Sequence, residues 1–234
     1  MPNLSYGRVV ELSHPIHPGI PRWPGDPAIA FTQVTDRDQD GYFLRAFSMG
    51  EHAATHLNAP LSFLADGPGV DAIPPEALIC PAVVIDAREE AASNPDFALG
   101  IDHVQAWEAR HGRIPAGSLA LLCTGWGAFW GDPARFLGLD SAGQAHFPGY
   151  GTEAARFLLE ERQLSGLGSD THGIEPGWDA QFQVNRLALR AGAIVLENLA
   201  SLEQLPPVGA VLVIGILRLV GGSGSPAAVI ALIP

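Results

Sequence analysis

Short, continuous runs of apolar residues recur along the last two thirds of the chain and alternate with segments of helical periodicity. Four runs have the length and composition of strands that are buried on both faces. They span residues 81–86, 118–123, 193–196 and 211–214. Because strands and helices alternate from about residue 80 onward, the pattern predicts an α/β fold with a mixed sheet.

Two helices are predicted between these strands. The first covers residues 102–112, where Asp102 and Gln105 have the spacing of a capping box. The second begins near Thr152 and leaves residues 160–162 in water. Its buried positions are expected to be Ala154, Phe157 and Leu158.

The first 75 residues have a different pattern, in which Pro and Gly interrupt short apolar pieces. Such pieces are typical of strands between tight turns, and none reads as a long helix. The chain has no linker, charge block, low-complexity segment or internal repeat, so residues 1–234 are interpreted as one domain.

Composition narrows the classes of partner. The 234 residues include 25 Asp and Glu against 13 Lys and Arg, a formal charge of −12, which argues against nucleic acid and anionic membranes as partners. The longest apolar run, residues 208–217, is too short to span a bilayer, and the first residues lack a signal-peptide pattern. Cys80 and Cys123 lie in apolar surroundings and are predicted to be buried thiols. A cytoplasmic protein is expected.

Two histidine pairs are candidates for chemistry. His14 and His17 lie among prolines and are interpreted as a surface turn. His52 and His56 are followed by Asn58, and these three positions would share one face of a strand, while the two histidines would also share one face of a helix. Spacing alone leaves two interpretations open: a metal or acid/base site, or two histidines in a polar loop.

The segment 52–63 resembles the His-x-Gly-Thr-His-x-Asp-x-Pro-x-His motif of the cyclase family, which includes bacterial kynurenine formamidases and isatin hydrolases. This resemblance implies a swivelling β/β/α fold, a homo-oligomer (dimer or tetramer), and hydrolysis of amide or lactone bonds with one or two divalent ions. Further blocks that resemble this family are residues 21–26, 166–171, 196–199 and 221–226. The last of these is interpreted as a turn that lines the pocket.

The resemblance also implies a ligand set for the metal, which this chain only partly keeps. The positions that match the family are His52, His56 and Glu197, and the altered ones are Asn58 for aspartate and Ser62 and Asn185 for two histidines. Because Asn cannot neutralise two cations as a bridging carboxylate does, a binuclear site is not expected. The remaining alternatives are one ion (Zn or Mn) and a metal-free pocket. The ligands of the single ion would be His52, His56, Asn58 and Glu197.

A second reactive segment covers residues 170–175. His172 is a candidate acid or base that Asp170 or Glu175 would orient, against the alternative that Asp170 caps a turn and His172 is exposed. Ser62 is not expected to be a nucleophile, because no strand-turn-helix elbow surrounds it.

Together these residues predict a hydrolase or cyclase that acts on an amide, lactam or lactone carbonyl of a small molecule. Without a metal, a histidine would transfer the proton while Asn58 and Asn185 stabilise the oxyanion. The alternative is a catalytically silent binding or scaffold protein that keeps the fold. The predicted catalytic residues are His52, His56, Asn58, Asp170 and His172, and the predicted substrate contacts are Trp23, Ser62, Phe63 and Asn185.

Overall fold

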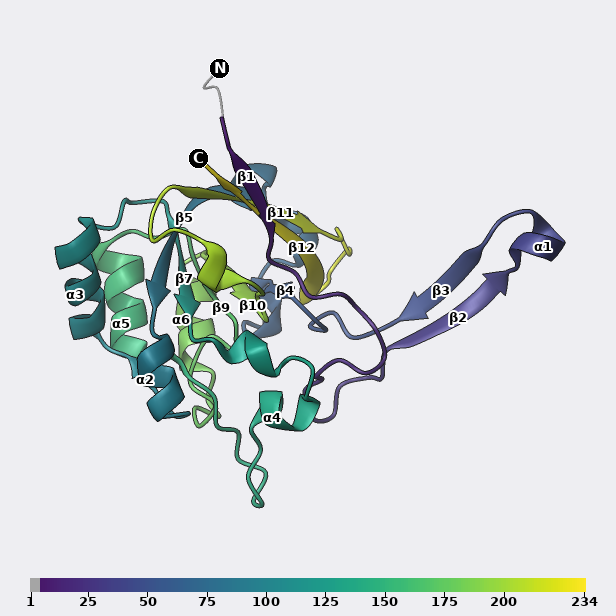
Figure 1. Cartoon of the computed structure of the whole chain (residues 1–234), viewed down its shortest axis with the longest axis horizontal. Helices are drawn as coiled ribbons and strands as arrows, with labels where there is room; N and C mark the ends of the chain where they lie inside the picture. Colours follow the sequence, from purple (N-terminus) through teal and green to yellow (C-terminus); the bar gives the residue numbers. More distant parts are fainter. Residues whose placement is uncertain (1–4) are drawn as a thin grey trace.

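A closed β-sheet, helices packed on its outside and one long β-hairpin make up the molecule (Figure 1). The computed structural model describes residues 5–234. The strands are β1 (Arg8–Glu11), β2 (Ala30–Thr35), β3 (Leu44–Ser48), β4 (His56–Asn58), β5 (Ile79–Asp86), β6 (Ala98–Leu99), β7 (Leu119–Cys123), β8 (Gly149–Tyr150), β9 (Gly166–Ser169), β10 (Ile194–Glu197), β11 (Ala210–Ile216) and β12 (Gly224–Ile233). The α-helices are α1 (Arg37–Asp40), α2 (Arg88–Ser93), α3 (Ile101–His111), α4 (Pro133–Leu137), α5 (Thr152–Arg156) and α6 (Gln183–Arg190).

The sheet closes on itself through the short strand β4. Its strand order is β12-β11-β5-β7-β9-β10-β4, and β4 pairs with β12 as well as β10, while β1 is added beside β12. Strands β5, β7, β9 and β10 are parallel, and the other pairings in this sheet are antiparallel. The predicted α/β fold with a mixed sheet is confirmed.

Strand β7 shows why its sequence is apolar throughout. Leu119, Leu121 and Cys123 belong to the core inside the closed sheet. Ala120 and Leu122 alternate with them and belong to the second core, between the sheet and the helices. Since successive strand residues point to opposite faces, a strand covered on both sides needs an apolar residue at every position.

The four predicted inner strands correspond to β5, β7, β10 and β11. The first predicted helix is α3, but its capping box is not the expected one, because Gly100 is the N-cap and its amide donates to Nδ1 of His103 at 3.1 Å. The second helix begins at Thr152 as α5 and continues as a π-helical turn. Arg162 is not free in water there, since its guanidinium pairs with Glu108 at 2.7 Å.

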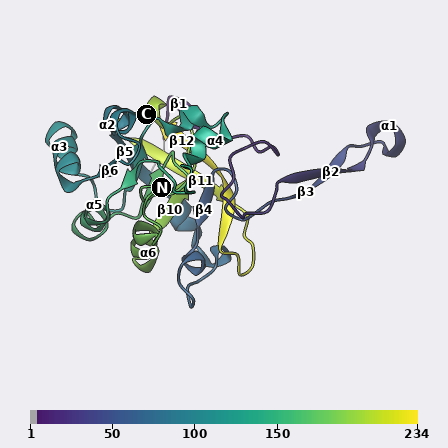
Figure 2. The ribbon, with the colours of Figure 1, turned by 90° about the horizontal axis from the view of Figure 1, so that it is seen from below.

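The hairpin formed by β2, α1 and β3 leaves the body of the molecule and is called the arm, residues 30–48. Its two strands pair antiparallel with each other, and two views at right angles show it projecting far from the closed sheet (Figures 1 and 2). The sequence predicts short strands in this region, and the arm confirms them.

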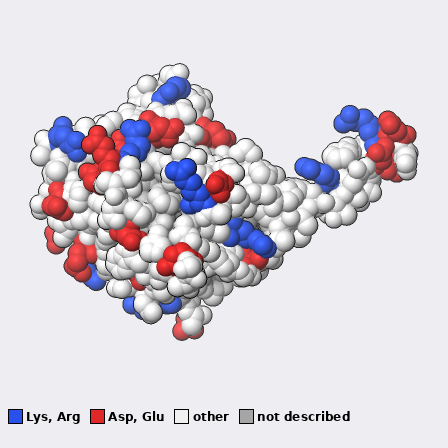
Figure 3. All heavy atoms as spheres, turned by 60° about the horizontal axis from the view of Figure 1, so that its bottom comes forward, with Lys and Arg blue, Asp and Glu red and all other residues white. Residues whose placement is uncertain are grey.

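Cys80 and Cys123 are buried, as predicted. The face drawn in Figure 3 carries acidic and basic side chains interspersed rather than in one basic patch. Within residues 5–234, no helix combines the length and apolar character that crossing a membrane requires. His17 is exposed as expected, whereas His14 is half-buried and stacks on Trp130 at 4.0 Å between ring centroids.

Candidate active site

A cavity of about 490 Å³ opens beside the carboxyl ends of β9 and β10, where the sheet closes. Its floor is polar and its walls are aromatic. The floor is formed by His52, His56, Asn58, His172, Glu175, Asn185 and Glu197. The walls include Trp23, Phe63, Phe147 and Phe182.

Strand β4 supplies two floor residues from one face. His56 and Asn58 point into the cavity, while Leu57 between them lies in the core of the closed sheet. The pairing of β4 with β10 places His56 directly opposite Glu197. The strand alternative for this motif is therefore correct for residues 56–58, and His52 reaches the site from the turn before the strand.

His56 and Glu197 form a buried ion pair. Nε2 of His56 lies 3.1 Å from a carboxylate oxygen of Glu197, and Nδ1 lies 2.9 Å from the carbonyl oxygen of Ala54. Burial opposes ionisation of Glu197, but the hydrogen bond and charge of His56 outweigh it and lower the pKa of this carboxyl. Both ring nitrogens of His56 therefore face oxygen acceptors, an arrangement that favours a proton on each of them.

Two asparagines complete the floor, and their amide protons are fully used. Nδ2 of Asn58 donates to Oδ1 of Asn185 (2.9 Å) and to Glu197 (3.0 Å). Nδ2 of Asn185 donates to Glu175 and to Glu197, both at 2.9 Å. An NH₂ group has two protons, so neither amide has one left for a substrate. The expectation that Asn58 and Asn185 stabilise an oxyanion is wrong for this arrangement.

His52 is held at both ring nitrogens. Nδ1 lies 2.8 Å from Oδ1 of Asn58, and Nε2 lies 2.9 Å from Oγ of Ser223, which also contacts Glu51 at 2.7 Å. A side chain at Gly224 would place its Cβ 2.6 Å from the His52 ring, so glycine there allows β12 to pack against this histidine. Residues 221–224 thus pack behind His52. The expectation that this turn lines the cavity is wrong for these residues.

The four predicted metal ligands therefore lie together but point at one another. Two imidazoles, a carboxylate and an amide oxygen are donors that a single Zn²⁺ or Mn²⁺ accepts. As arranged, however, no three His, Cys, Asp or Glu side chains in residues 5–234 converge as ion ligands. His52 is turned to Asn58 and Ser223 instead. This arrangement does not fit an ion without breaking hydrogen bonds, and the single-ion site stays a prediction.

His172 is buried and has one free nitrogen. Its Nδ1 lies 3.1 Å from Oδ1 of Asn198, an acceptor, so Nδ1 carries the proton. Nε2 makes no hydrogen bond within the described part of the chain, and the ring lines the cavity. Burial lowers the pKa of His172 to about 4, so the ring is neutral at pH 7 with its Nε2 lone pair available. The alternative of an exposed histidine is wrong.

The prediction that Asp170 orients His172 is wrong. The carboxylate of Asp170 lies outside the cavity and accepts from the amide (3.0 Å) and the hydroxyl (2.6 Å) of Thr124. Burial raises the pKa of Asp170 to about 6 despite these hydrogen bonds. Asp170 therefore ties the end of β9 to the end of β7, and Asn198 performs the orienting role that the prediction gave to a carboxylate.

Glu175 is a second buried carboxyl in the floor. Its two oxygens accept from the amide nitrogen and the side chain of Asn185, both at 2.9 Å. Burial, and then the charge of Glu197, raise the pKa of Glu175 to about 8. At neutral pH the floor thus contains one ionised carboxylate, Glu197, and one mostly protonated carboxyl.

Comparison with known proteins identifies the relatives of this site. The family model described as "Putative cyclase" matches residues 10–176. The chain belongs to the cyclase family. It is 35% identical to isatin hydrolase of Roseibium aggregatum over 219 residues, which is 89% of this chain and 82% of that protein. It is 23% identical to kynurenine formamidase of Salinibacter ruber, covering 93% and 94% of the two chains.

Solved structures agree with the sequence comparison. The structure of isatin hydrolase A from Ralstonia solanacearum superposes with a TM-score of 0.92 at 37% identity, covering 97% of this chain and 92% of that one. The predicted cyclase-family membership and fold are therefore confirmed.

The walls of the cavity in this cyclase-family protein contain aromatic side chains in contact with one another or with the floor. Trp23 stacks on His172 with ring centroids 5.2 Å apart, and Phe63 lies 5.3 Å from Phe182. Trp23, Phe63 and Ser62 line the cavity as predicted, although Oγ of Ser62 donates to the carbonyl of Ala59 at 2.6 Å, so this serine is not an activated nucleophile.

Several residues of the site were not assigned a role from the sequence. Asn198 follows Glu197 directly within the recognised block 196–199, and its neighbourhood could have suggested it. Phe147 and Phe182 carry no local pattern that separates them from core aromatics. Asp26 lies in the block 21–26, and its place in the cavity wall depends on how that turn folds over the sheet.

Proposed function

We propose that this protein is a cyclase-family hydrolase that adds water across the C–N bond of an amide or lactam in a flat small molecule. The observation that carries the proposal is the free Nε2 of His172, which faces an aromatic-walled cavity beside the His56–Glu197 ion pair. The likeness to isatin hydrolase and kynurenine formamidase supports the same class of bond.

The residues divide the work between base and charge stabilisation. Nε2 of His172 accepts a proton from the attacking water, while Asn198 holds the ring through Nδ1. The His56 imidazolium favours the negative charge that develops on the carbonyl oxygen. The proton held by His172 then passes to the leaving nitrogen, so that water and amide give an acid and an amine.

The low pKa of His172, about 4, limits which substrates this site can use. A base this weak removes a proton slowly from water, because efficiency follows the match between its pKa and the working pH. An activated carbonyl, as in an N-formyl anilide or a strained lactam, reduces that demand. We therefore assign the site to activated amides. No step in this mechanism passes through an ion.

Turnover of a small panel tests the proposal. The panel contains formanilide, isatin and a simple lactone, assayed with the protein as purified and after addition of Zn²⁺ or Mn²⁺. We expect His172→Ala to lower kcat/KM at least about 100-fold, the usual range for loss of a general base. His111→Ala, at an exposed position at the end of α3, is the matched control.

Each outcome has a distinct meaning. Equal turnover by His172→Ala and the unaltered protein would contradict the role of His172. Activity that appears only with added metal, with about one ion bound per chain, would favour the predicted single-ion site over the metal-free mechanism. Binding of the panel without any turnover would favour the alternative of a silent binding protein.

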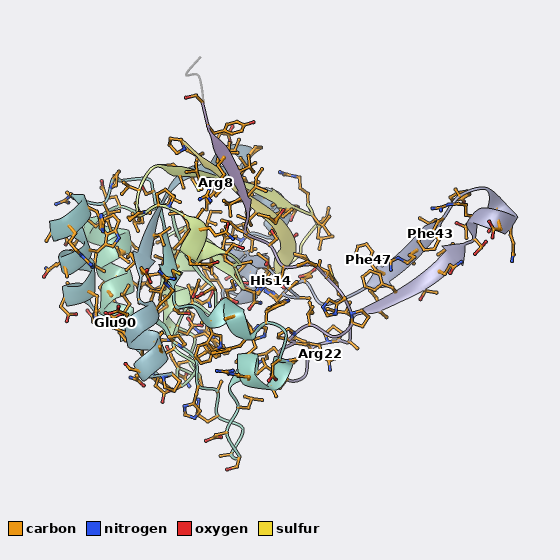
Figure 4. The ribbon with its side chains drawn as sticks, in the orientation of Figure 1. Arg8, His14, Arg22, Phe43, Phe47 and Glu90 are labelled. Atoms are coloured by element: carbon orange, nitrogen blue, oxygen red, sulfur yellow. The ribbon has the colours of Figure 1, made fainter. Side chains whose placement is uncertain are left out.

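We also propose that the protein is a homo-oligomer assembled through the arm. Apolar side chains along this hairpin are about half exposed among residues 5–234 (Figure 4 labels two, Phe43 and Phe47). The apolar positions are Val34, Tyr42, Phe43, Leu44 and Phe47, each 46–57% exposed. Exposed apolar surface of this extent on a projecting hairpin is typical of a protein–protein interface.

A further inference from the structure

The lining of the cavity is richer in carboxyl groups than in cationic groups, and His56, which is paired with Glu197, is the cation that the described lining contributes. The lining includes four carboxyl groups, Asp26, Glu175, Asp179 and Glu197. None of the 13 basic residues, all of them arginines, lies among the lining residues. Carboxylates in a partly enclosed, apolar-walled cavity act strongly on a charged ligand, because little water screens them.

Three of these carboxyl groups are already occupied by partners in the protein. Glu197 pairs with His56, and Glu175 accepts two hydrogen bonds from Asn185. Asp179 is buried and accepts from the amides of Gln181 and Gln183 at 2.9 and 3.1 Å. Their oxygens hold the floor and the start of α6 in place.

Asp26 is different. Its side chain is half-buried in the cavity wall, and no hydrogen bond or ion pair from residues 5–234 reaches its carboxylate. The nearby Arg22 donates to the backbone oxygen of Asp26, not to its side chain. The charge of Asp26 acts on the ring of His172, where it opposes part of the lowering that burial causes in the pKa of that histidine. A free carboxylate therefore stands next to the proposed base.

We propose that the cavity selects flat aromatic amides that are uncharged or carry an ammonium group, and rejects those that carry a carboxylate, with Asp26 as the selecting residue. This inference rests on the proposed function for the word "amide", but the charge selection depends only on the cavity. Two arginines lie behind the walls and outside the lining: Arg22 donates to the backbone oxygen of Asp26 at 2.7 Å, and Arg186 donates to the carbonyl of Phe63 at 2.9 Å.

Binding of three probes with one ring tests this selection independently of turnover. The probes are 2-naphthylmethylamine, 2-naphthamide and 2-naphthoate, which differ in charge and share a flat bicyclic ring. Titration followed by ligand-observed NMR gives the three values of Kd for the full-length protein. We expect naphthoate to bind at least about tenfold more weakly than naphthamide, a modest effect for one repelling charge at partly screened distance.

Single substitutions test whether Asp26 causes the difference in Kd between naphthoate and naphthamide. Asp26→Asn should reduce the difference between naphthoate and naphthamide to less than about threefold, while Glu89→Gln, an exposed carboxylate on α2, should leave it unchanged. Arg45→Ala, on the arm, examines whether a second copy brings a cation to the cavity.

The inference is overturned if naphthoate binds as tightly as naphthamide, if none of the probes binds, or if the difference persists in full in Asp26→Asn. Naphthoate binding that is lost in Arg45→Ala would also overturn it and assign the charge of the site to the partner copy. Because the probes are not followed by hydrolysis, failure of the proposed function would appear as absent turnover with the charge preference intact.

Discussion

The closed sheet and the arm satisfy their surfaces in opposite ways. At the site where the sheet closes, buried polar groups form hydrogen bonds with one another. His56 pairs with Glu197, and the side-chain amides of Asn58 and Asn185 donate to neighbouring oxygens. On the arm, aromatic side chains such as Phe43 and Phe47 are about half exposed in the part of the chain that the structure describes. These polar groups of the body are satisfied within one chain, whereas the arm exposes the apolar surface on which the proposed assembly rests.

This difference predicts whether a substitution changes the stability of the chain or its association with other copies. In the body, removal of one partner leaves another buried group unsatisfied, so the effect falls on the free energy of unfolding. In the arm, removal of an apolar side chain changes little within the chain, so the effect falls on association. Three predictions, in order of expected size, test that division.

The largest effect is expected in the ion pair of the site. Glu197→Ala leaves the buried His56 imidazolium and two amides without their acceptor, and should lower the free energy of unfolding by about 3–5 kcal/mol. Chemical denaturation monitored by circular dichroism measures this change.

Glu197→Gln is the matched control for that substitution. Its oxygen can accept from both asparagines and its NH₂ can donate to a neutral His56, so we expect a loss below about 1.5 kcal/mol. A loss as large as that of the alanine variant would show that the network is not the source of stability.

The second effect is expected in association. Phe47→Asp places a charge on the arm, where Phe47 is 57% exposed, and should weaken the association of copies at least about 100-fold, equivalent to about 2.7 kcal/mol. Sedimentation velocity across a concentration series measures the change. Val220→Asp, at a position that is 92% exposed away from the arm, should leave the assembly intact. An assembly unaffected by Phe47→Asp would argue against the arm as the interface.

The third effect concerns pH. Burial and the charge of Glu197 raise the pKa of Glu175 to about 8 from 4.5, so the folded state favours its protonated form. That stabilisation is complete below pH 4.5 and is lost as pH rises to about 8. Between pH 6.5 and pH 8 the titration of Glu175 should lower the free energy of unfolding by about 1.6 kcal/mol, and the end of the His172 titration in the unfolded state offsets only a few tenths of a kcal/mol of that loss.

Glu175→Gln provides the comparison for this slope. Because glutamine does not titrate, its unfolding free energy should be nearly constant over the same range, whatever its absolute value. A slope equal to that of the unaltered protein would assign the pH dependence to another group.

The sequence predicts the inner strands well, because β5, β7 and β10 contribute to the cores on both faces of the sheet and therefore contain continuous apolar runs. Strand β11 is fully buried on one face and half-buried on the other, yet it keeps an apolar run as well. The sequence also brings His52, His56 and Asn58 to one site, through a spacing that strand geometry and the family motif share, and the family resemblance of residues 196–199 adds Glu197. These features depend on local pattern or on the family resemblance.

Features that depend on distant partners were missed. Asp170 was assigned to His172, two residues away, but it binds Thr124, 46 residues earlier, because β7 and β9 are adjacent strands. The projection of the arm from the body was likewise not predictable, since a hairpin's own sequence specifies the pairing of its strands and not their orientation relative to the closed sheet. The sequence also did not show that Asn58 donates both of its side-chain amide protons to Asn185 and Glu197, because that follows only from the complete hydrogen-bond network.

Strand β4 has a consequence for the order in which the protein is made. It pairs with β10 and β12, so His56 meets its partner strands only after residues 194–233 have been synthesised. Contacts that span most of a chain form slowly, since the closure entropy of the long intervening loop must be overcome first. The catalytic floor is therefore among the last parts of the molecule to assemble, and an incomplete nascent chain has no active site.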